Sequence, residues 1–274
     1  MVGCRRNCFD MKLSRFVIFC LAALLSIGFT NSAYGQESVR VVSMNIRLGG
    51  ELAQFDSQPY ADFINEHNPD FVCLQEVDYK TLHNGKRDFL NEVAMKTGMF
   101  PIFFQSMPYW GGGYGTAILS RYPFYRSYSN VFPKYDKEKE PRACGWVYVQ
   151  LPSGQRIRVV TVHLALMTPT ATVNNINFNN KELFKQDSVI PTLMVGDFNA
   201  QAGSDPINYC KKKWDEMCPG IGFTIPADKP AKQLDFVMGY PKGSWTCKPE
   251  NFKIYPRPDL SDHCFLVVDV DLKK

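Results

Sequence analysis

Polar and charged side chains end several short apolar runs of this sequence, at points where a buried strand would stop. Such a side chain needs a partner, because burial without one costs free energy. Asp197 and Asn199 follow one run two residues apart, so in an extended chain both point to the same side. Each position taken singly is more often a turn or a cap than a catalytic residue. The whole set comprises Asn45, Glu76, His163, Asp197, Asn199, Asp235, Asp262 and His263.

These residue types together indicate metal-assisted cleavage of a phosphoester. Carboxylate and amide oxygens suit Mg²⁺ or Mn²⁺, whereas zinc prefers more nitrogen or sulfur ligands. A carboxylate beside a histidine orients the imidazole, which can then deprotonate water or stabilise a charged transition state. Two of the four histidines, His163 and His263, belong to the set. The other two, His67 and His83, have polar helical or loop-like neighbours and are interpreted as surface residues.

The elements that must position these side chains are many short strands and a few helices. Helices are predicted over Gln58–Glu66 and Arg87–Thr97, each between two strands, so the early chain alternates β and α. Gly111–Gly113 is interpreted as a loop. Without repeats or linkers, one mature domain is predicted. The predicted strands are Val39–Ile46, Phe71–Val77, Gly115–Ser120, Cys144–Leu151, Ile157–Leu166, Thr192–Val195, Leu234–Met238 and Cys264–Leu272.

Residues 1–35 have the layout of a secretory signal peptide. Basic residues precede an apolar run from Phe16 to Phe29, which is shorter than the roughly 20 residues of a membrane-spanning helix. Small residues at Ala33 and Gly35 predict cleavage before Gln36, and an uncleaved anchor or a buried N-terminal helix is the alternative. A secreted or periplasmic protein is therefore expected, with its domain over residues 36–274.

The charge and the cysteines of the mature chain limit its function. Residues 1–35 hold four of the 31 basic residues and one of the 27 acidic ones, so the net charge of +4 falls to +1 without them. A nuclease usually has a basic face, and this charge balance argues mildly against a nuclease.

The cysteines give no sign of a zinc site, because the sequence contains no Cys-x-x-Cys pair. Cys210, Cys218 and Cys247 lie in loop-like sequence where a disulfide is able to form in an oxidising compartment.

The motifs around these residues resemble those of the endonuclease/exonuclease/phosphatase superfamily, from about residue 39 to 270. The resemblance implies a deoxyribonuclease-like α/β fold, a four-layer sandwich of two packed mixed β-sheets flanked by helices. It also implies a metal-dependent phosphoesterase. The matching blocks are Val42–Arg47, Leu74–Val77, Gly115–Arg121, Thr161–Leu164, Gly196–Ala200, Leu234–Val237 and Ser261–His263.

The resemblance also implies a metal site at matching positions. Glu76 would be the main Mg²⁺ ligand, with Mn²⁺ as the alternative cation, and Asn45 and Asp262 would complete the metal side. Whether one metal ion or two take part remains an open question.

The catalytic roles implied by the resemblance fall on five residues. His263, oriented by Asp235, would act as general base or as a phosphate stabiliser. His163 and Asn199 would hold phosphate oxygens, and Asp197 would position or activate the attacking water. Whether His263 or Asp197 takes the proton stays open.

One segment departs from the family pattern. Many members have a long amphipathic helix between the positions of His163 and Gly196, but Asn174–Asn180 holds five asparagines and is predicted to be a poor helix former. Tyr114 and Arg142 lie near the expected cleft. Arg142 is interpreted either as a phosphate clamp or as a surface strand residue.

A small or lipid-derived phosphoester is the favoured substrate, because it needs only a local pocket. The segment Met107–Trp110 is then an apolar wall or a contact with a membrane surface, or it is ordinary packing. A nuclease acting on DNA or RNA is the first alternative, and a non-catalytic binding or effector protein of the same fold is the second. A monomer is expected, since nothing in the sequence demands an oligomer.

Overall fold

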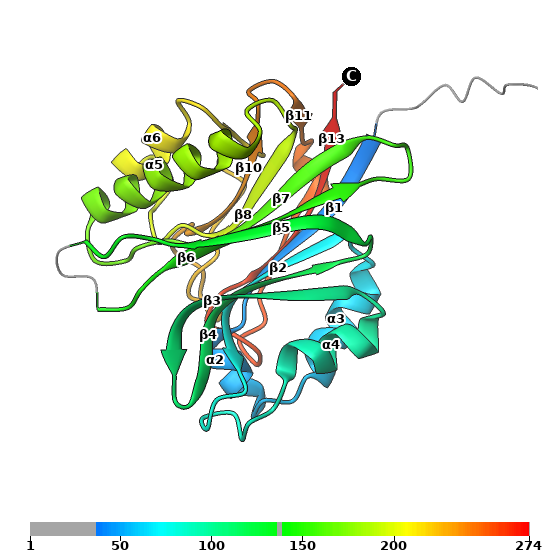
Figure 1. Ribbon diagram of the computed structural model, residues 1–274, viewed down its shortest axis with the longest axis vertical. Coiled ribbons are helices and arrows are strands. Elements are labelled where there is room, and N and C mark those ends of the chain that lie inside the picture. Colours follow the sequence, from blue (N-terminus) through cyan, green and yellow to red (C-terminus); the bar gives the residue numbers. More distant parts are fainter. Residues whose placement is uncertain (1–36, 136–138, 274) are drawn as a thin grey trace, which may run out of the picture. The chain divides into compact units, whose positions relative to one another are not determined.

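The computed structural model describes residues 37–135 and 139–273, which belong to one compact unit from Gln36 to Lys274. The predicted signal peptide lies outside the described residues. Two mixed β-sheets pack against each other, with helices on their outer faces (Figure 1). The predicted α/β sandwich is therefore confirmed.

Each sheet is built around one parallel pair of strands, β1–β2 or β7–β8, with antiparallel strands outside it. The seven-stranded sheet has the order β11 (Trp245–Thr246), β13 (Phe265–Leu272), β1 (Glu37–Asn45), β2 (Phe71–Tyr79), β4 (Gly112–Ser120) and β3 (Phe100–Tyr109), with β12 (Phe252–Tyr255) also paired to β13. The six-stranded sheet has the order β5 (Phe124–Val131), β6 (Ala143–Gln150), β7 (Arg156–His163), β8 (Thr192–Asp197), β10 (Asp235–Tyr240) and β9 (Asp215–Glu216).

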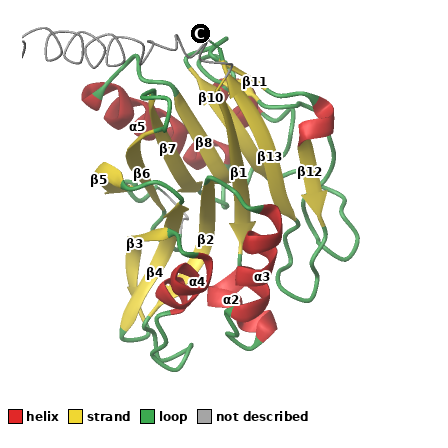
Figure 2. Ribbon diagram, turned by 90° about the vertical axis from the view of Figure 1, so that its right-hand side faces the viewer, coloured by secondary structure: helices red, strands yellow, loops and turns green. Residues whose placement is uncertain are grey.

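The side-chain alternation of the strands creates three apolar layers. Val41 and Val159 point into the layer between the sheets, whereas Val42 points toward one set of helices and Val160 toward the other. In Figure 2 the helices α2, α3 and α4 lie together, apart from α5. Within the described residues, no helix combines the length and apolarity needed to cross a membrane. The helices are α2 (Arg47–Gly50), α3 (Gln58–His67), α4 (Phe89–Thr97), α5 (Pro169–Gln186) and α6 (Asp205–Cys210), with 3₁₀ turns at Glu51–Ala53 and Pro249–Asn251.

Helix α5 contradicts the prediction that Asn174–Asn180 is a poor helix former. The helix spans 18 residues, and the Thr168 hydroxyl caps its start by accepting from the Ala171 N–H at 3.1 Å. Its buried asparagines are bonded to the rest of the protein: Asn175 Oδ1 accepts from a backbone N–H at 2.9 Å, and Asn180 Oδ1 from an indole N–H at 2.8 Å. These tertiary hydrogen bonds outweigh the low intrinsic helix propensity of asparagine.

Three further sequence interpretations need correction. Gly112 and Gly113 belong to strand β4, so the loop is only the turn before them. His67 is 9% exposed and its Nδ1 lies 3.1 Å from the Phe63 carbonyl oxygen. His83 is half-buried, whereas His67 is buried. The polar neighbours in the sequence misled the interpretation of both histidines, because burial depends on how the helices and loops pack.

Gly145 in β6 leaves room for the Phe104 side chain of the other sheet. A Cβ atom at this position would lie 2.0 Å from Cγ of Phe104, which is buried in β3. We expect Gly145→Ala to lower the free energy of unfolding by about 3 kcal/mol, the upper end for overpacked cores. Thermal unfolding monitored by circular dichroism should then show a melting temperature lower by about 6–12 °C. Adding Phe104→Leu should recover part of the loss, and an unchanged melting temperature in Gly145→Ala would contradict this packing.

Candidate active site

Strand pairing brings the predicted side chains to one edge of the two sheets. In the six-stranded sheet, Asp197 at the end of β8 is in register with His163 at the end of β7 and with Asp235 at the start of β10. In the other sheet, Asn45 ends β1 beside β2, which carries Glu76. Asn45 Nδ2 donates to Asp197 Oδ2 at 3.3 Å, so the two sheets meet at this edge.

His263 and Asp235 form a buried pair at this edge. The imidazole Nδ1 lies 2.8 Å from Asp235 Oδ2, and the two residues are 5% and 1% exposed. Burial alone would lower the pKa of His263, but the Asp235 carboxylate overcomes it and the pKa rises to about 10. The Ser261 hydroxyl accepts from the His263 N–H and donates to the Asn45 carbonyl. Ser261 therefore fixes the backbone at His263, while Asp235 holds the imidazole.

Asp197 is the centre of the site. Its Oδ1 accepts from the Asn199 N–H at 2.8 Å, and its Oδ2 lies 3.5 Å from His163 Nε2 and 3.8 Å from His263 Nε2. Burial raises the pKa of Asp197, while the charge of His263 opposes the shift. Two imidazole groups therefore lie within 3.8 Å of Asp197 Oδ2.

His163 is held by Arg142. From the sequence, this arginine was compatible with a phosphate clamp and with a surface strand residue. Arg142 Nη1 lies 3.0 Å from both ring nitrogens of His163, and its side chain is only 10% exposed. Burial, together with the charges of Arg142 and His263, places the pKa of His163 well below its ordinary value. The structure therefore places Arg142 in the site, where its pairing with His163 and Glu140 has no signature in the sequence.

Glu76 reaches the site through an irregularity in β2. The register against β4 shifts between Leu74 and Val77, and Glu76 adopts a φ of +61°, which is unfavourable for a residue with a side chain. Its Oε1 accepts from Asn45 Nδ2 at 3.1 Å, and its Oε2 accepts from the Leu48 N–H at 3.0 Å. Such bulges re-aim side chains beside functional sites.

Asp262, the remaining predicted metal ligand, is paired with Arg47. The guanidinium Nη1 lies 2.7 Å from Asp262 Oδ2, and the Arg47 Nε contacts Glu51 at 3.1 Å. The Arg47 N–H also donates to Asn45 Oδ1 at 3.0 Å. Arg47 belongs to a matching sequence block, but an arginine after a strand carries no local signal for this pairing.

The amide of Asn199 is used within the protein. Its Nδ2 donates to the Leu164 carbonyl at 3.0 Å, and the residue has a φ of +49°. Gly196, three residues before Asn199, is needed for close packing, since a Cβ there would lie 2.2 Å from the Val162 carbonyl oxygen. These contacts fix the turn that places Asn199 beside Asp197.

The donors at this edge suit a hard divalent cation. Among the described His, Cys, Asp and Glu residues, Asp197, Asp235 and His263 offer ligand atoms that all lie within 4.8 Å of one another. Glu76 adds a half-buried carboxylate beside Asn45, whose Nδ2 donates to Glu76 Oε1 and to the same Asp197 Oδ2 that faces both imidazoles. A set rich in oxygen donors fits Mg²⁺ or Mn²⁺ better than zinc.

Two apolar features border the site. A cavity of about 320 Å³ opens beside Asn199 and Leu234, and its lining includes Leu166, which is 56% exposed, and Lys232. The segment Met107–Trp110 comprises the end of β3 and the first residue of the turn to β4. Trp110 is 61% exposed, and the Tyr109 ring centroid lies 5.5 Å from that of Tyr114, whose pKa is raised by burial and by the Glu76 carboxylate.

Comparison with known proteins connects this geometry to a family. The model of the Endonuclease/Exonuclease/phosphatase family matches residues 42–263. No curated protein matches. A solved endonuclease/exonuclease/phosphatase from Bacteroides vulgatus is 17% identical with a TM-score of 0.71, covering 86% of this chain and 100% of its own.

Two further solved structures are of enzymes with named activities. A mannosyl-6-phosphatase from Bacteroides thetaiotaomicron and a sphingomyelinase C from Streptomyces griseocarneus are each 14% identical, with TM-scores of 0.64 and 0.65. Each covers 86% of this chain and 100% of its own. At these identities the three structures establish the fold.

Proposed function

The chain belongs to the endonuclease/exonuclease/phosphatase family, whose members are metal-dependent phosphoester hydrolases, and we propose that it cleaves a small or lipid-derived phosphoester outside the cytoplasm with Mg²⁺ as its cation. The observation that carries this proposal is the buried Asp235–His263 pair facing Asp197 at the edge where both sheets meet. The oxygen donors support Mg²⁺, and the layout of residues 1–35 supports export.

The tasks of the side chains follow from their contacts. The cation, when bound at Asn45 and Glu76, supplies positive charge that polarises the phosphoryl oxygens. Asp197 accepts hydrogen bonds from its neighbours and positions the attacking water. His263 is held by Asp235 with its Nε2 toward Asp197, and because its pKa is raised to about 10 the imidazole carries a proton at neutral pH, which leaves Asp197 to accept the proton of the water.

A second group of side chains beside Asp197 holds the phosphate. His163, supported by Arg142, offers a ring N–H, and the guanidinium adds a positive charge near the same place. Both groups stabilise negative charge that develops on the phosphoryl oxygens in the transition state. Their positions are fixed by burial, so little reorganisation is needed during the reaction.

The surroundings of the site favour a compact substrate. The cavity beside Asn199 measures about 320 Å³, which lies at the lower end for small-molecule pockets. Its lining combines apolar side chains such as Leu166 with one cation, Lys232. This chemistry suits an apolar or sugar-like ester group attached to the phosphate, in line with the similar folds of the mannosyl-6-phosphatase and the sphingomyelinase C.

Hydrolysis assays with the purified protein test the proposal. The substrates are p-nitrophenyl phosphate, bis-p-nitrophenyl phosphate, a hexose 6-phosphate, sphingomyelin vesicles and plasmid DNA, each with Mg²⁺, with Mn²⁺ and with a chelator. Metal-dependent turnover of the small or lipid substrates, lost in His263→Ala, supports the proposal. Turnover of DNA alone would establish the nuclease alternative, and inactivity on every substrate would favour the non-catalytic protein.

A charge placed in the cavity should weaken substrate binding. We expect Leu166→Asp to raise KM for bis-p-nitrophenyl phosphate about 5- to 10-fold with little change in kcat, because ~50 Å² of lost apolar contact is worth about 1.3 kcal/mol. Steady-state kinetics measure this split. Val189→Asp is the matched control, since Val189 is 74% exposed and lies three residues before the amino end of β8, whereas the site lies at its carboxyl end. Equal KM values in the two variants would remove the cavity from the substrate site.

A further inference from the structure

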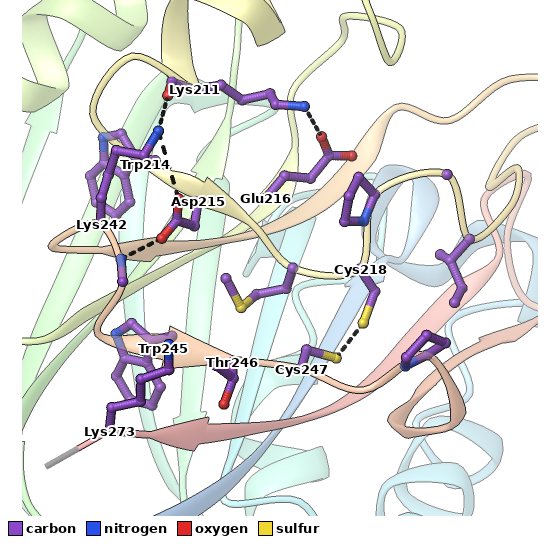
Figure 3. A pocket seen from close by; sticks show the side chains of 16 residues that line it. Lys211, Trp214, Asp215, Glu216, Cys218, Lys242, Trp245, Thr246, Cys247 and Lys273 are labelled. Atoms are coloured by element: carbon purple, nitrogen blue, oxygen red, sulfur yellow. Dashed lines mark hydrogen bonds and ion pairs between the residues drawn. The ribbon is translucent and has the colours of Figure 1, made fainter.

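Two cysteines that follow strands of different sheets lie against each other. They are at the end of the strands far from the candidate site. The Sγ atoms of Cys218 and Cys247 are 2.7 Å apart, and Figure 3 shows the two side chains pointing toward one another. Cys218 follows β9 of the six-stranded sheet, and Cys247 follows β11 of the seven-stranded sheet. Their contact therefore spans the two sheets.

The position of this pair separates it from the phosphoesterase chemistry. Strand β11 pairs with Leu272 and Asp271 at the carboxyl end of β13, whereas His263 precedes the amino end of that strand. Eight residues of extended chain span about 25 Å. A change at the cysteine pair therefore leaves the site residues in place.

Oxidants have access to this pair. Both cysteines line an open cavity of about 720 Å³ (Figure 3), which is large enough for a small molecule. Cys247 is half-buried, and Cys218 is 8% exposed. The remaining cysteines of the described chain, namely Cys73, Cys144, Cys210 and Cys264, are at most 1% exposed.

We propose that Cys218 and Cys247 form a disulfide that joins the two sheets at this end of the protein. A disulfide requires an S–S distance of about 2.05 Å, so the two sulfurs need to approach each other by only about 0.7 Å. The sequence left three cysteines open as disulfide partners, and the structure selects two of them. The expectation of an exported protein is consistent with such a bond, because disulfides persist in oxidising compartments.

The oxidant is an external disulfide such as glutathione disulfide. The more accessible Cys247 loses its proton, and its thiolate attacks one sulfur of the oxidant, releasing one glutathione thiolate. The Cys218 thiolate then attacks the mixed disulfide and releases the second glutathione. Two protein thiols are oxidised, one external disulfide is reduced to two thiols, and two protons pass to the released glutathione. Because burial raises the pKa of both cysteines, the reaction is expected to be faster at alkaline pH.

Peptide mapping tests the bond directly. After treatment of the purified protein with glutathione disulfide and alkylation without reducing agent, Cys218 and Cys247 are expected in one linked peptide that reduction separates. Recovery of both cysteines as separately alkylated peptides would overturn the proposal. So would a stable glutathione adduct on Cys247 beside a free Cys218.

Thermal unfolding tests the consequence for the fold. The bond closes a loop of about 30 residues, so we expect the oxidised protein to melt about 10 °C higher than the reduced protein. The double variant C218S/C247S should show no such difference, whereas Cys210→Ala should keep it. Equal melting temperatures of the oxidised and reduced protein would show that the bond does not constrain the sheets. Hydrolase activity at 25 °C is expected to be the same in both redox states, so this proposal stands or falls independently of the proposed function.

Discussion

Asp235→Asn is expected to reduce kcat for phosphoester hydrolysis about 10³-fold. The substitution keeps the shape of the side chain but removes the negative charge that lies 2.8 Å from His263 Nδ1. Without that charge, the imidazole loses both its fixed orientation and the interaction that keeps its pKa high. General acid–base catalysis contributes about 10²–10⁴-fold, and an aspartate that orients a histidine has an effect of similar size.

Steady-state kinetics with Mg²⁺ measure the loss of kcat, and an unchanged KM shows that substrate binding is not affected. The expected change lies in kcat, because Asp235 contacts His263 and is itself 1% exposed. Asp271→Asn, at the far end of β13, is the matched control and should retain full activity. Circular dichroism should show that both variants are folded. Activity within 10-fold of the unchanged protein in a folded Asp235→Asn variant would contradict the role assigned to this pair.

Much of the fold was predictable because apolar runs with polar ends mark strands whose carboxyl ends meet at one edge. The predictions failed where this signal is weak. Strand β3 contains Pro101 and Pro108, and β5 is largely exposed, so neither has a continuous apolar run. Helix α5 was underestimated because Asn175 and Asn180 are stabilised by partners far away in the sequence. Local patterns do not contain such long-range hydrogen bonds.

The residues that the resemblance singled out come together, but their partners were less predictable. Asn45, Asp197 and His163 have recognisable positions at strand ends, and the register of the sheets brings them side by side. Arg142 and Arg47 interact with the site through long side chains whose direction the sequence does not specify. An arginine on a strand is equally compatible with solvent and with a buried partner, so only the fold decides between the two.

Glu76→Gln is expected to weaken binding of the divalent cation about 100-fold or more. The variant keeps the length of the side chain and the acceptor for the Leu48 N–H, but it loses the charge beside Asn45. Cation sites of this kind depend on one or two carboxylates, and even partners behind the ligands change affinity about 10–100-fold. Titration calorimetry with Mg²⁺ and electron paramagnetic resonance with Mn²⁺ measure the affinity without relying on turnover.

Glu66→Gln is the matched control for this experiment, because Glu66 lies exposed on α3 and is not among the predicted site residues. Its cation affinity should equal that of the unchanged protein. If Glu76→Gln loses both affinity and hydrolysis, the cation is held on the Asn45 side of the site. Undiminished Mn²⁺ binding by Glu76→Gln would instead move the cation to Asp197, Asp235 and His263, whose ligand atoms lie within 4.8 Å of one another. In that case, the strained backbone at Glu76 would serve to position the Asn45 amide.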